Sequence, residues 1–212
     1  MASPQGLAYR GLITRVYIET GTKRVFACAL DWPGWCRSGR TEEAALDALA
    51  LYVNRYAPVA REAGLELSAD AVELEVVERV SGGKTTDFGA PEAKLASDAE
   101  PLKGDELHRT RALLAAAWRY FDRVAAGAPG ELRKGPRGGG RDTAKIVEHI
   151  YDAESAYAPR LGIKIADPLE RRDAMLAGLQ LTGTKWPARF VARRTAWHAL
   201  DHAWEIEDRT PR

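Results

Sequence analysis

Apolar residues in the first 80 positions recur mostly at the two-residue period of β-strands. Three segments have this character, at 11–20, 24–30 and 72–76. Val16 and Ile18 share one face of the first segment, whereas the second is apolar enough to be buried on both faces. The glycine-containing turn between these two segments predicts a β-hairpin. In the third segment apolar residues alternate with glutamates, which predicts a half-buried strand.

Between the second and third predicted strands the apolar period becomes helical. Pro33-Gly34 signals a turn, and Thr41 is suited to cap a helix whose first turn holds two glutamates. The apolar residues that recur at three- and four-residue spacing are Ala45, Leu49, Tyr52, Val53 and Tyr56. We expect Pro58 and Gly64 to end this helix.

After residue 103 the pattern is that of four amphipathic helices. Gly127–Gly130 ends the first, Asp142 is a suitable N-cap for the second, and Pro168 and Pro187 open the third and fourth. The fourth helix runs to about Asp208. The apolar residues on the faces of the first three helices are Leu107, Leu114, Trp118, Phe121 and Ala125, then Ile146, Ile150, Ala153 and Tyr157, then Leu169, Leu176 and Leu179.

These elements predict an α+β protein with two domains. A small sheet with a helix spans 1–82, a segment without periodicity forms a linker over 83–103, and an all-α four-helix bundle spans 104–212. The core of such a bundle is a natural place for a metal or ligand site.

Composition narrows the class of protein. Of 212 residues 45% are apolar, which suffices for packed cores, and the net charge of +1 argues against nucleic-acid or membrane-surface binding. No apolar run approaches the roughly 20 residues of a membrane helix, and 1–10 lacks a signal-peptide core. We therefore expect a cytoplasmic protein whose Cys28 and Cys36 are thiols. The charge is uneven, because residues 1–98 hold 11 basic and 14 acidic side chains and the remainder 20 and 16.

Three of the four histidines fall on predicted inward faces of the bundle. His198 and His202 are four residues apart and project in one direction, with about 5–6 Å between Cβ atoms. His149 shares the apolar face of the second helix. Three imidazoles that leave a coordination position open form a catalytic divalent-metal site, for which zinc, nickel and iron are not distinguished. Histidines hydrogen-bonded to neighbours are the alternative, which we prefer for exposed His108.

Two acidic residues are candidates to assist the metal site. Glu205 lies on the face of His198 and His202, so it is a candidate fourth ligand, a group that orients an imidazole, or a catalytic general base on metal-bound water. An ion pair on the helix surface with Arg209 is an alternative. Asp152, three residues after His149, is a second candidate to orient an imidazole.

A basic, glycine-rich loop precedes the second helix of the predicted bundle. Arg137 and Arg141 in this loop are candidates to bind the carboxylate or phosphate of a ligand. The loop lacks the Gly-Lys-Ser/Thr of a P-loop, so nucleotide hydrolysis is not indicated. A flexible connection between helices explains the same glycines without a ligand.

Two segments carry a family resemblance. GGGRDTAKIVEHIYDAE at 138–154 and RTAWHALDHAWEIEDR at 194–209 resemble the DinB-like superfamily, which includes bacillithiol- and mycothiol-dependent S-transferases and mycothiol-dependent maleylpyruvate isomerase. The resemblance covers 103–212. It implies a four-helix bundle in which His149, His198 and His202 bind a divalent metal, often zinc or nickel.

The segment FACALDWPGWCRSGRTEEA at 26–44 resembles the N-terminal module of HicB-type antitoxins. This resemblance implies a small sheet with one or two helices that binds a partner protein. In those antitoxins a DNA-binding segment follows, and here the predicted bundle takes its place.

The function that follows is metal-dependent action on a small-molecule substrate, with transfer of a low-molecular-weight thiol or hydrolysis as the implied reaction. The alternative is a non-enzymatic module that binds a protein partner and has a structural or sensory metal site. A DNA-binding regulator is the weakest hypothesis, because no recognition-helix motif accompanies the basic residues. The sequence leaves a homodimer open.

Overall fold

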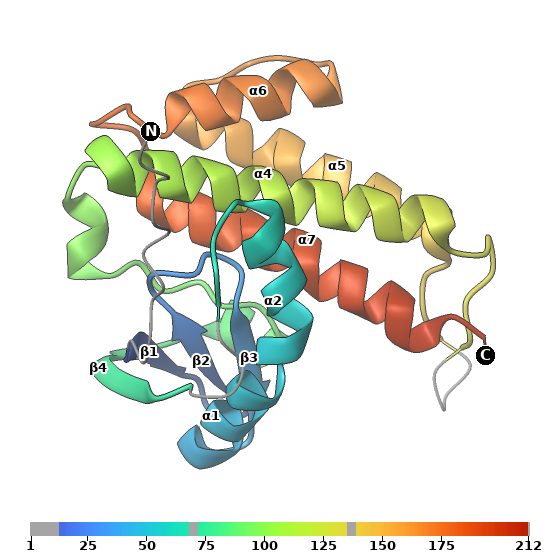
Figure 1. The fold of residues 1–212 in the computed structure, drawn as a ribbon, viewed down its shortest axis with the longest axis horizontal. Coiled ribbons are helices and arrows are strands. Elements are labelled where there is room, and N and C mark those ends of the chain that lie inside the picture. Colours follow the sequence, from blue (N-terminus) through green and yellow to red (C-terminus); the bar gives the residue numbers. More distant parts are fainter. Residues whose placement is uncertain (1–12, 68–71, 135–138, 212) are drawn as a thin grey trace, which may run out of the picture. The chain divides into compact units, whose positions relative to one another are not determined.

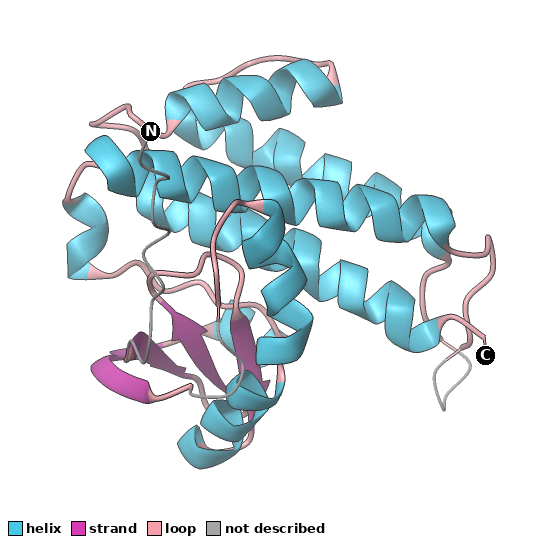
Figure 2. Ribbon diagram, in the orientation of Figure 1, coloured by secondary structure: helices cyan, strands magenta, loops and turns pink. Residues whose placement is uncertain are grey.

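The computed structural model describes residues 13–67, 72–134 and 139–211. The chain forms two compact units, the first ending at Pro91 and the second beginning at Glu92, with Trp32–Gly34 counted in the second. Strands occur in the first unit and the long helices in the second (Figures 1 and 2). The protein is therefore α+β, as predicted. No helix among the described residues is long and apolar enough to cross a membrane.

The described residues of the first unit form a four-stranded sheet in the order β3-β2-β1-β4 (Figure 1). Strands β1 and β2, and β2 and β3, pair antiparallel, whereas β1 and β4 pair parallel. The elements of this unit are β1 (Thr14–Thr20), β2 (Val25–Ala29), β3 (Cys36–Gly39), α1 (Glu42–Leu51), α2 (Val53–Glu62), β4 (Leu74–Ser81) and α3 (Lys84–Phe88).

The predicted hairpin is confirmed by the pairing of β1 with β2. Val16 lies opposite Ala29 and Ile18 opposite Ala27, and every residue of β2 is buried. The third predicted strand exists as β4, but it begins at Leu74 and continues to Ser81. Strand β3 was not predicted, because its four residues are mostly polar and show no alternation.

The predicted helix after Thr41 is present but divided. The Thr41 hydroxyl accepts a hydrogen bond from the backbone N–H of Ala44 at 3.1 Å, as a cap should. The helix is interrupted at Tyr52, and Pro58 lies inside α2, so the expectation that Pro58 ends the helix is wrong. Burial of Val59 and Ala60 after the proline offsets the lost backbone hydrogen bond, which costs about 3 kcal/mol in an exposed helix.

Cys28 and Cys36 are joined by a disulfide in this structure, so the expectation of two thiols is wrong. They are directly opposed on β2 and β3, with Cα atoms 4.0 Å apart. The pairing was missed because it depends on the register of β3, which the sequence pattern did not reveal.

The described part of the second unit is built mainly from four long helices. These are α4 (Gly104–Gly127), α5 (Thr143–Tyr157), α6 (Pro168–Gly178) and α7 (Ala188–Arg209), with the short 3₁₀ helices η1 (Ala96–Ala99) and η2 (Ala158–Leu161). Helix α7 packs against α4 and α5, and α6 packs against the same two helices (Figure 1). The predicted helix starts at Asp142, Pro168 and Pro187 are confirmed within one residue.

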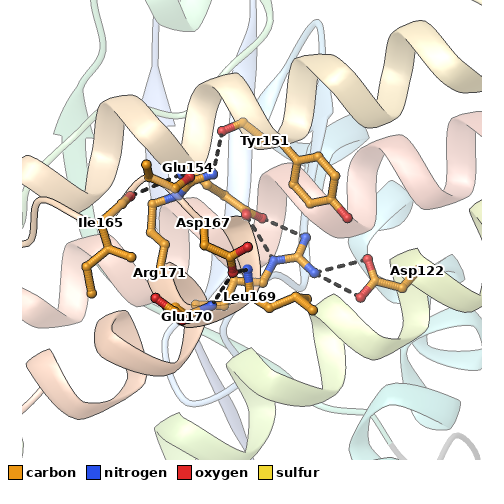
Figure 3. Close-up of polar contacts among 10 residues, drawn as sticks. Asp122, Tyr151, Glu154, Ile165, Asp167, Leu169, Glu170 and Arg171 are labelled. Atoms are coloured by element: carbon orange, nitrogen blue, oxygen red, sulfur yellow. Dashed lines mark hydrogen bonds and ion pairs between the residues drawn. The ribbon is translucent and has the colours of Figure 1, made fainter.

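Two consecutive arginines fix α6 in the second unit (Figure 3). Arg172 donates two 2.9 Å hydrogen bonds to the buried carboxylate of Glu154 on α5, and its Nη1 lies 2.8 and 3.0 Å from the Asp122 oxygens on α4. Arg171 donates to the carbonyls of Tyr151, at 3.2 Å, and other residues. Leu169, predicted to face the core, is 65% exposed, because arginines form much of the inner face of α6.

Replacing Arg172 with Met should strongly destabilise the second unit. The Arg172 and Glu154 side chains are only 5% and 2% exposed, and the substitution leaves a buried carboxylate without its cation. We expect the free energy of unfolding to fall by about 3–5 kcal/mol in urea denaturation followed by circular dichroism. Lys145→Met, which removes a 70% exposed partner of Glu148, is the control and should cost less than about 0.5 kcal/mol. Equal losses for the two variants would contradict the assigned role of Arg172.

The last residue of β3 admits no side chain. A Cβ on Gly39 would lie 2.6 Å from the backbone of Ala44 and Ala45 at the start of α1. We expect Gly39→Ala to lower the unfolding free energy by about 1–3 kcal/mol, because α1 must shift away from the sheet. At Gly127 a Cβ meets nothing within 4 Å, so Gly127→Ala should be neutral or stabilise by up to about 1 kcal/mol. A neutral Gly39→Ala in the same denaturation assay would show that this contact does not constrain α1.

Candidate metal centre

Three histidines from two helices of the second unit converge. His198 and His202 lie one turn apart on α7, and His149 faces them from α5. The ring centroid of His149 lies 4.9 Å from that of His198 and 5.1 Å from that of His202. The ring centroids of the two histidines on α7 are 4.9 Å apart. Each histidine offers one ring nitrogen within 4.8 Å of the others, so the cluster is able to hold a metal ion.

The distance between two of these nitrogens suits a shared metal. His149 Nε2 and His198 Nε2 are 3.1 Å apart. Two nitrogens bound to one ion at about 2.0–2.1 Å would be separated by roughly 3.0–3.4 Å for the usual coordination angles. The donor set, three imidazoles without a thiolate, matches zinc, nickel and iron alike.

Burial keeps these imidazoles in the form that binds a metal. His198 is only 8% exposed, and burial lowers its pKa to about 2, with further contributions from the charges of His202 and His149. Burial is also the largest cause that lowers the pKa of His149, followed by the charge of Arg141. A neutral imidazole has a free lone pair, so His149 and His198 are available as ligands at neutral pH.

Glu205 holds His202 in one orientation. Its Oε2 lies 2.7 Å from His202 Nδ1, and its Oε1 accepts a 2.5 Å hydrogen bond from Arg209 Nη1. These contacts, the one with His202 first, lower the pKa of Glu205 and keep it a carboxylate. A carboxylate requires the Nδ1 position of His202 to carry the proton, which leaves Nε2 to bind a metal. Among the three roles predicted for Glu205 this geometry favours orientation, and a catalytic role stays a prediction.

Two further candidates, Asp152 and Arg141, influence the histidines through their charge. Asp152 is exposed, and its charge raises the pKa of His149 slightly against the larger lowering effects. Arg141 is exposed, and its charge lowers the pKa of both His149 and His198. The anion-binding role of Arg141 stays a prediction. Arg137 lies outside the described residues.

Aromatic side chains lie beside the cluster, and the sequence pattern assigned none of them to the site. Trp197 stacks on His198 with 5.8 Å between ring centroids. The ring of Tyr157 is tilted relative to that of His198, and their centroids are 6.2 Å apart. The Trp186 ring lies 5.4 Å from that of Tyr157, and the guanidinium of Arg194 lies 4.9 Å from the Trp197 ring. Trp186 comes from the loop before α7, and no periodicity in that loop pointed to it.

Comparison of this chain with protein-family models, with curated proteins and with solved structures finds no match. The DinB-like and HicB-type resemblances therefore stay predictions, and the interpretation of the cluster depends on its geometry.

The buried histidine predicts how stability depends on pH in the metal-free protein. The pKa of His198 is about 2 when folded and about 6.5 when unfolded, so the unfolded chain binds more protons between these values. Stability is therefore retained above pH 6.5 and lost as the pH falls below it, by up to about 1.4 kcal/mol per pH unit.

This dependence is measurable by urea denaturation in the presence of a chelator from pH 7.5 to 5. The variant His198→Gln has no titrating group at this position, so its unfolding free energy should fall less steeply over the same range. Identical slopes for the two proteins would contradict the burial of a neutral imidazole.

Proposed function

We propose that this chain is a divalent-metal-dependent protein of the DinB-like type that acts on a small molecule. In this proposal α4, α5, α6 and α7 form the four-helix bundle, and His149, His198 and His202 hold the ion. A bound divalent ion would act as a Lewis acid that lowers the pKa of a thiol or water, or polarises a carbonyl. Transfer of a low-molecular-weight thiol or hydrolysis is the corresponding reaction.

The observation that supports this proposal is the convergence of three imidazoles from α5 and α7. Their ligand atoms lie within 4.8 Å of one another, and burial keeps two of them neutral. A neutral imidazole has one nitrogen that donates a hydrogen bond and one that accepts or binds a metal. Here His149 and His198 direct the same type of nitrogen, Nε2, at each other across 3.1 Å, an arrangement that a shared cation stabilises.

The neighbouring side chains fit a site that accepts a substrate. Both oxygens of Glu205 are engaged, by His202 and by Arg209, so three protein ligands are at hand rather than four. Three ligands are typical of catalytic zinc sites, whereas structural sites have four. The charge of Arg141 would attract an anionic group of the substrate, and the rings of Tyr157 and Trp197 would exclude water from one side.

For the first unit we propose the partner-binding role of a HicB-type module. Its support is that three strands of the sheet, β1, β2 and β3, are followed by a helix capped by Thr41, the order that this resemblance implies.

Metal analysis tests the proposal directly. The purified protein, stripped by chelator and reloaded in turn with Zn²⁺, Ni²⁺ or Fe²⁺, should retain about one equivalent of at least one ion after desalting. His198→Ala should retain almost none, because two ligands bind far more weakly than three. His108→Ala, which removes an exposed histidine outside the cluster, should behave as the wild type. Wild-type protein that retains less than about 0.2 equivalents of every ion would refute the proposal.

The Co²⁺-loaded protein separates the enzymatic proposal from its alternative. With an open coordination position, added thiol should change the visible absorption of the bound Co²⁺, because a sulfur ligand replaces water. A spectrum that neither thiols nor small anions alter would favour a structural or sensory metal in a non-enzymatic partner-binding protein.

A further inference from the structure

The hydrogen bonds around Glu205 continue beyond the three histidines. Glu205 Oε2 lies 2.7 Å from His202 Nδ1, and its Oε1 accepts a 2.5 Å bond from Arg209 Nη1. The next bond runs from Arg209 Nε to the backbone carbonyl of Arg133 at 2.9 Å. Hydrogen bonds therefore connect His202, through Glu205 and Arg209, to the backbone of Arg133, which follows α4.

Arg133 makes further contacts with the end of α7. The backbone N–H of Arg133 donates to the Arg209 carbonyl at 2.8 Å, and its guanidinium donates to the carbonyl of Asp208. Shortly before α5, Gly140 has a φ of +124°, and a Cβ there would lie 2.6 Å from Arg209 Nη2. The glycine therefore lets the backbone lie against the guanidinium, a reason for its presence that requires no ligand.

We infer that Arg209 is a positioning residue, which fixes the Glu205 carboxylate against His202 and so sustains the metal affinity of the cluster. This inference depends on the metal site proposed above. The side-chain hydrogen bonds of Arg209 go to Glu205 and to the Arg133 carbonyl. Arg209 acts by holding one carboxylate oxygen, so that the other stays in line with Nδ1, and Nε2 of His202 would be the nitrogen that binds an ion.

The planar fork of arginine is what this position requires. Nη1 donates a hydrogen bond to Glu205 while Nε donates one to the Arg133 carbonyl. A lysine would have to make both hydrogen bonds from one nitrogen at the end of a flexible side chain. Without Arg209 the Glu205 side chain is free to rotate toward solvent. His202 would then lose the acceptor that fixes its ring and its tautomer.

Arg189 offers a matched control on the same helix. Its guanidinium also binds one carboxylate, Glu106 at 2.7 Å, and two backbone carbonyls, Glu100 at 2.8 Å and Pro101 at 3.4 Å. It therefore joins α7 to another segment in the same manner, but at the end of the helix away from His202. A purely structural effect of losing such an arginine should appear in both variants.

The experiment measures the affinity of Co²⁺ and Zn²⁺ by competition with a chromophoric chelator, and the visible spectrum of the Co²⁺ form. We expect Arg209→Met to weaken binding about tenfold and to shift the Co²⁺ absorption, because the orientation of His202 is lost. Arg209→Lys should give an intermediate affinity. Arg189→Met should bind within about twofold of wild type with an unchanged spectrum, whatever its loss of stability.

A double variant tests whether Arg209 acts through Glu205. Glu205→Ala should weaken binding by about 10–100-fold, and Glu205→Ala/Arg209→Met should lie within about twofold of that value. Additive losses would overturn the inference. So would wild-type affinity and spectrum in Arg209→Met, or equal losses of affinity in Arg209→Met and Arg189→Met. Wild-type protein that binds neither ion would refute the proposed metal site itself.

Discussion

The burial of α7 is the constraint on which the second unit depends. From Ala188 to Ile206 most residues of this helix are buried, on more than one face, so a charged side chain there needs a partner within the protein. Arg193 is paired with Asp98, with one contact at 2.8 Å, and His198 lies against His149. The histidine cluster is thus one way in which a buried polar side chain of α7 is paired with another helix. A metal ion would bind the ligand nitrogens of α5 and α7 at once.

The same constraint explains why arginines form the inner face of α6. Guanidinium groups reach several acceptors at once, so Arg171 and Arg172 attach a short helix to carbonyls and carboxylates of α4 and α5 (Figure 3). The carboxylate of Glu154 could not otherwise be buried. Burial raises its pKa, and the two hydrogen bonds from Arg172 act in the opposite direction. Polar pairs therefore set the positions of both α6 and α7, around which apolar residues pack.

The sequence predicted those features that depend on local chemistry and period. Thr41 caps its helix, and the i,i+4 spacing of His198 and His202 placed both on one face, where His149 meets them. Features that depend on register or on long-range pairing were missed. Strand β3 exists because it pairs with β2, and this pairing brings the two cysteines together. Leu169 was assigned to the core by periodicity, although charged side chains occupy that face of α6.

The hydrogen bonds of Glu205 distinguish two possible roles for this residue, a fourth metal ligand and a group that orients His202. As a fourth ligand it would have to release His202 Nδ1 or Arg209, and both contacts are short, at 2.7 and 2.5 Å. Release of Arg209 would also leave its guanidinium, which packs against Gly140, without a carboxylate. As an orienting group Glu205 keeps every one of these contacts and leaves Nε2 of His202 available as a ligand. The arrangement that disturbs the fewest hydrogen bonds is therefore a three-histidine ligand set, the kind that leaves room for a substrate.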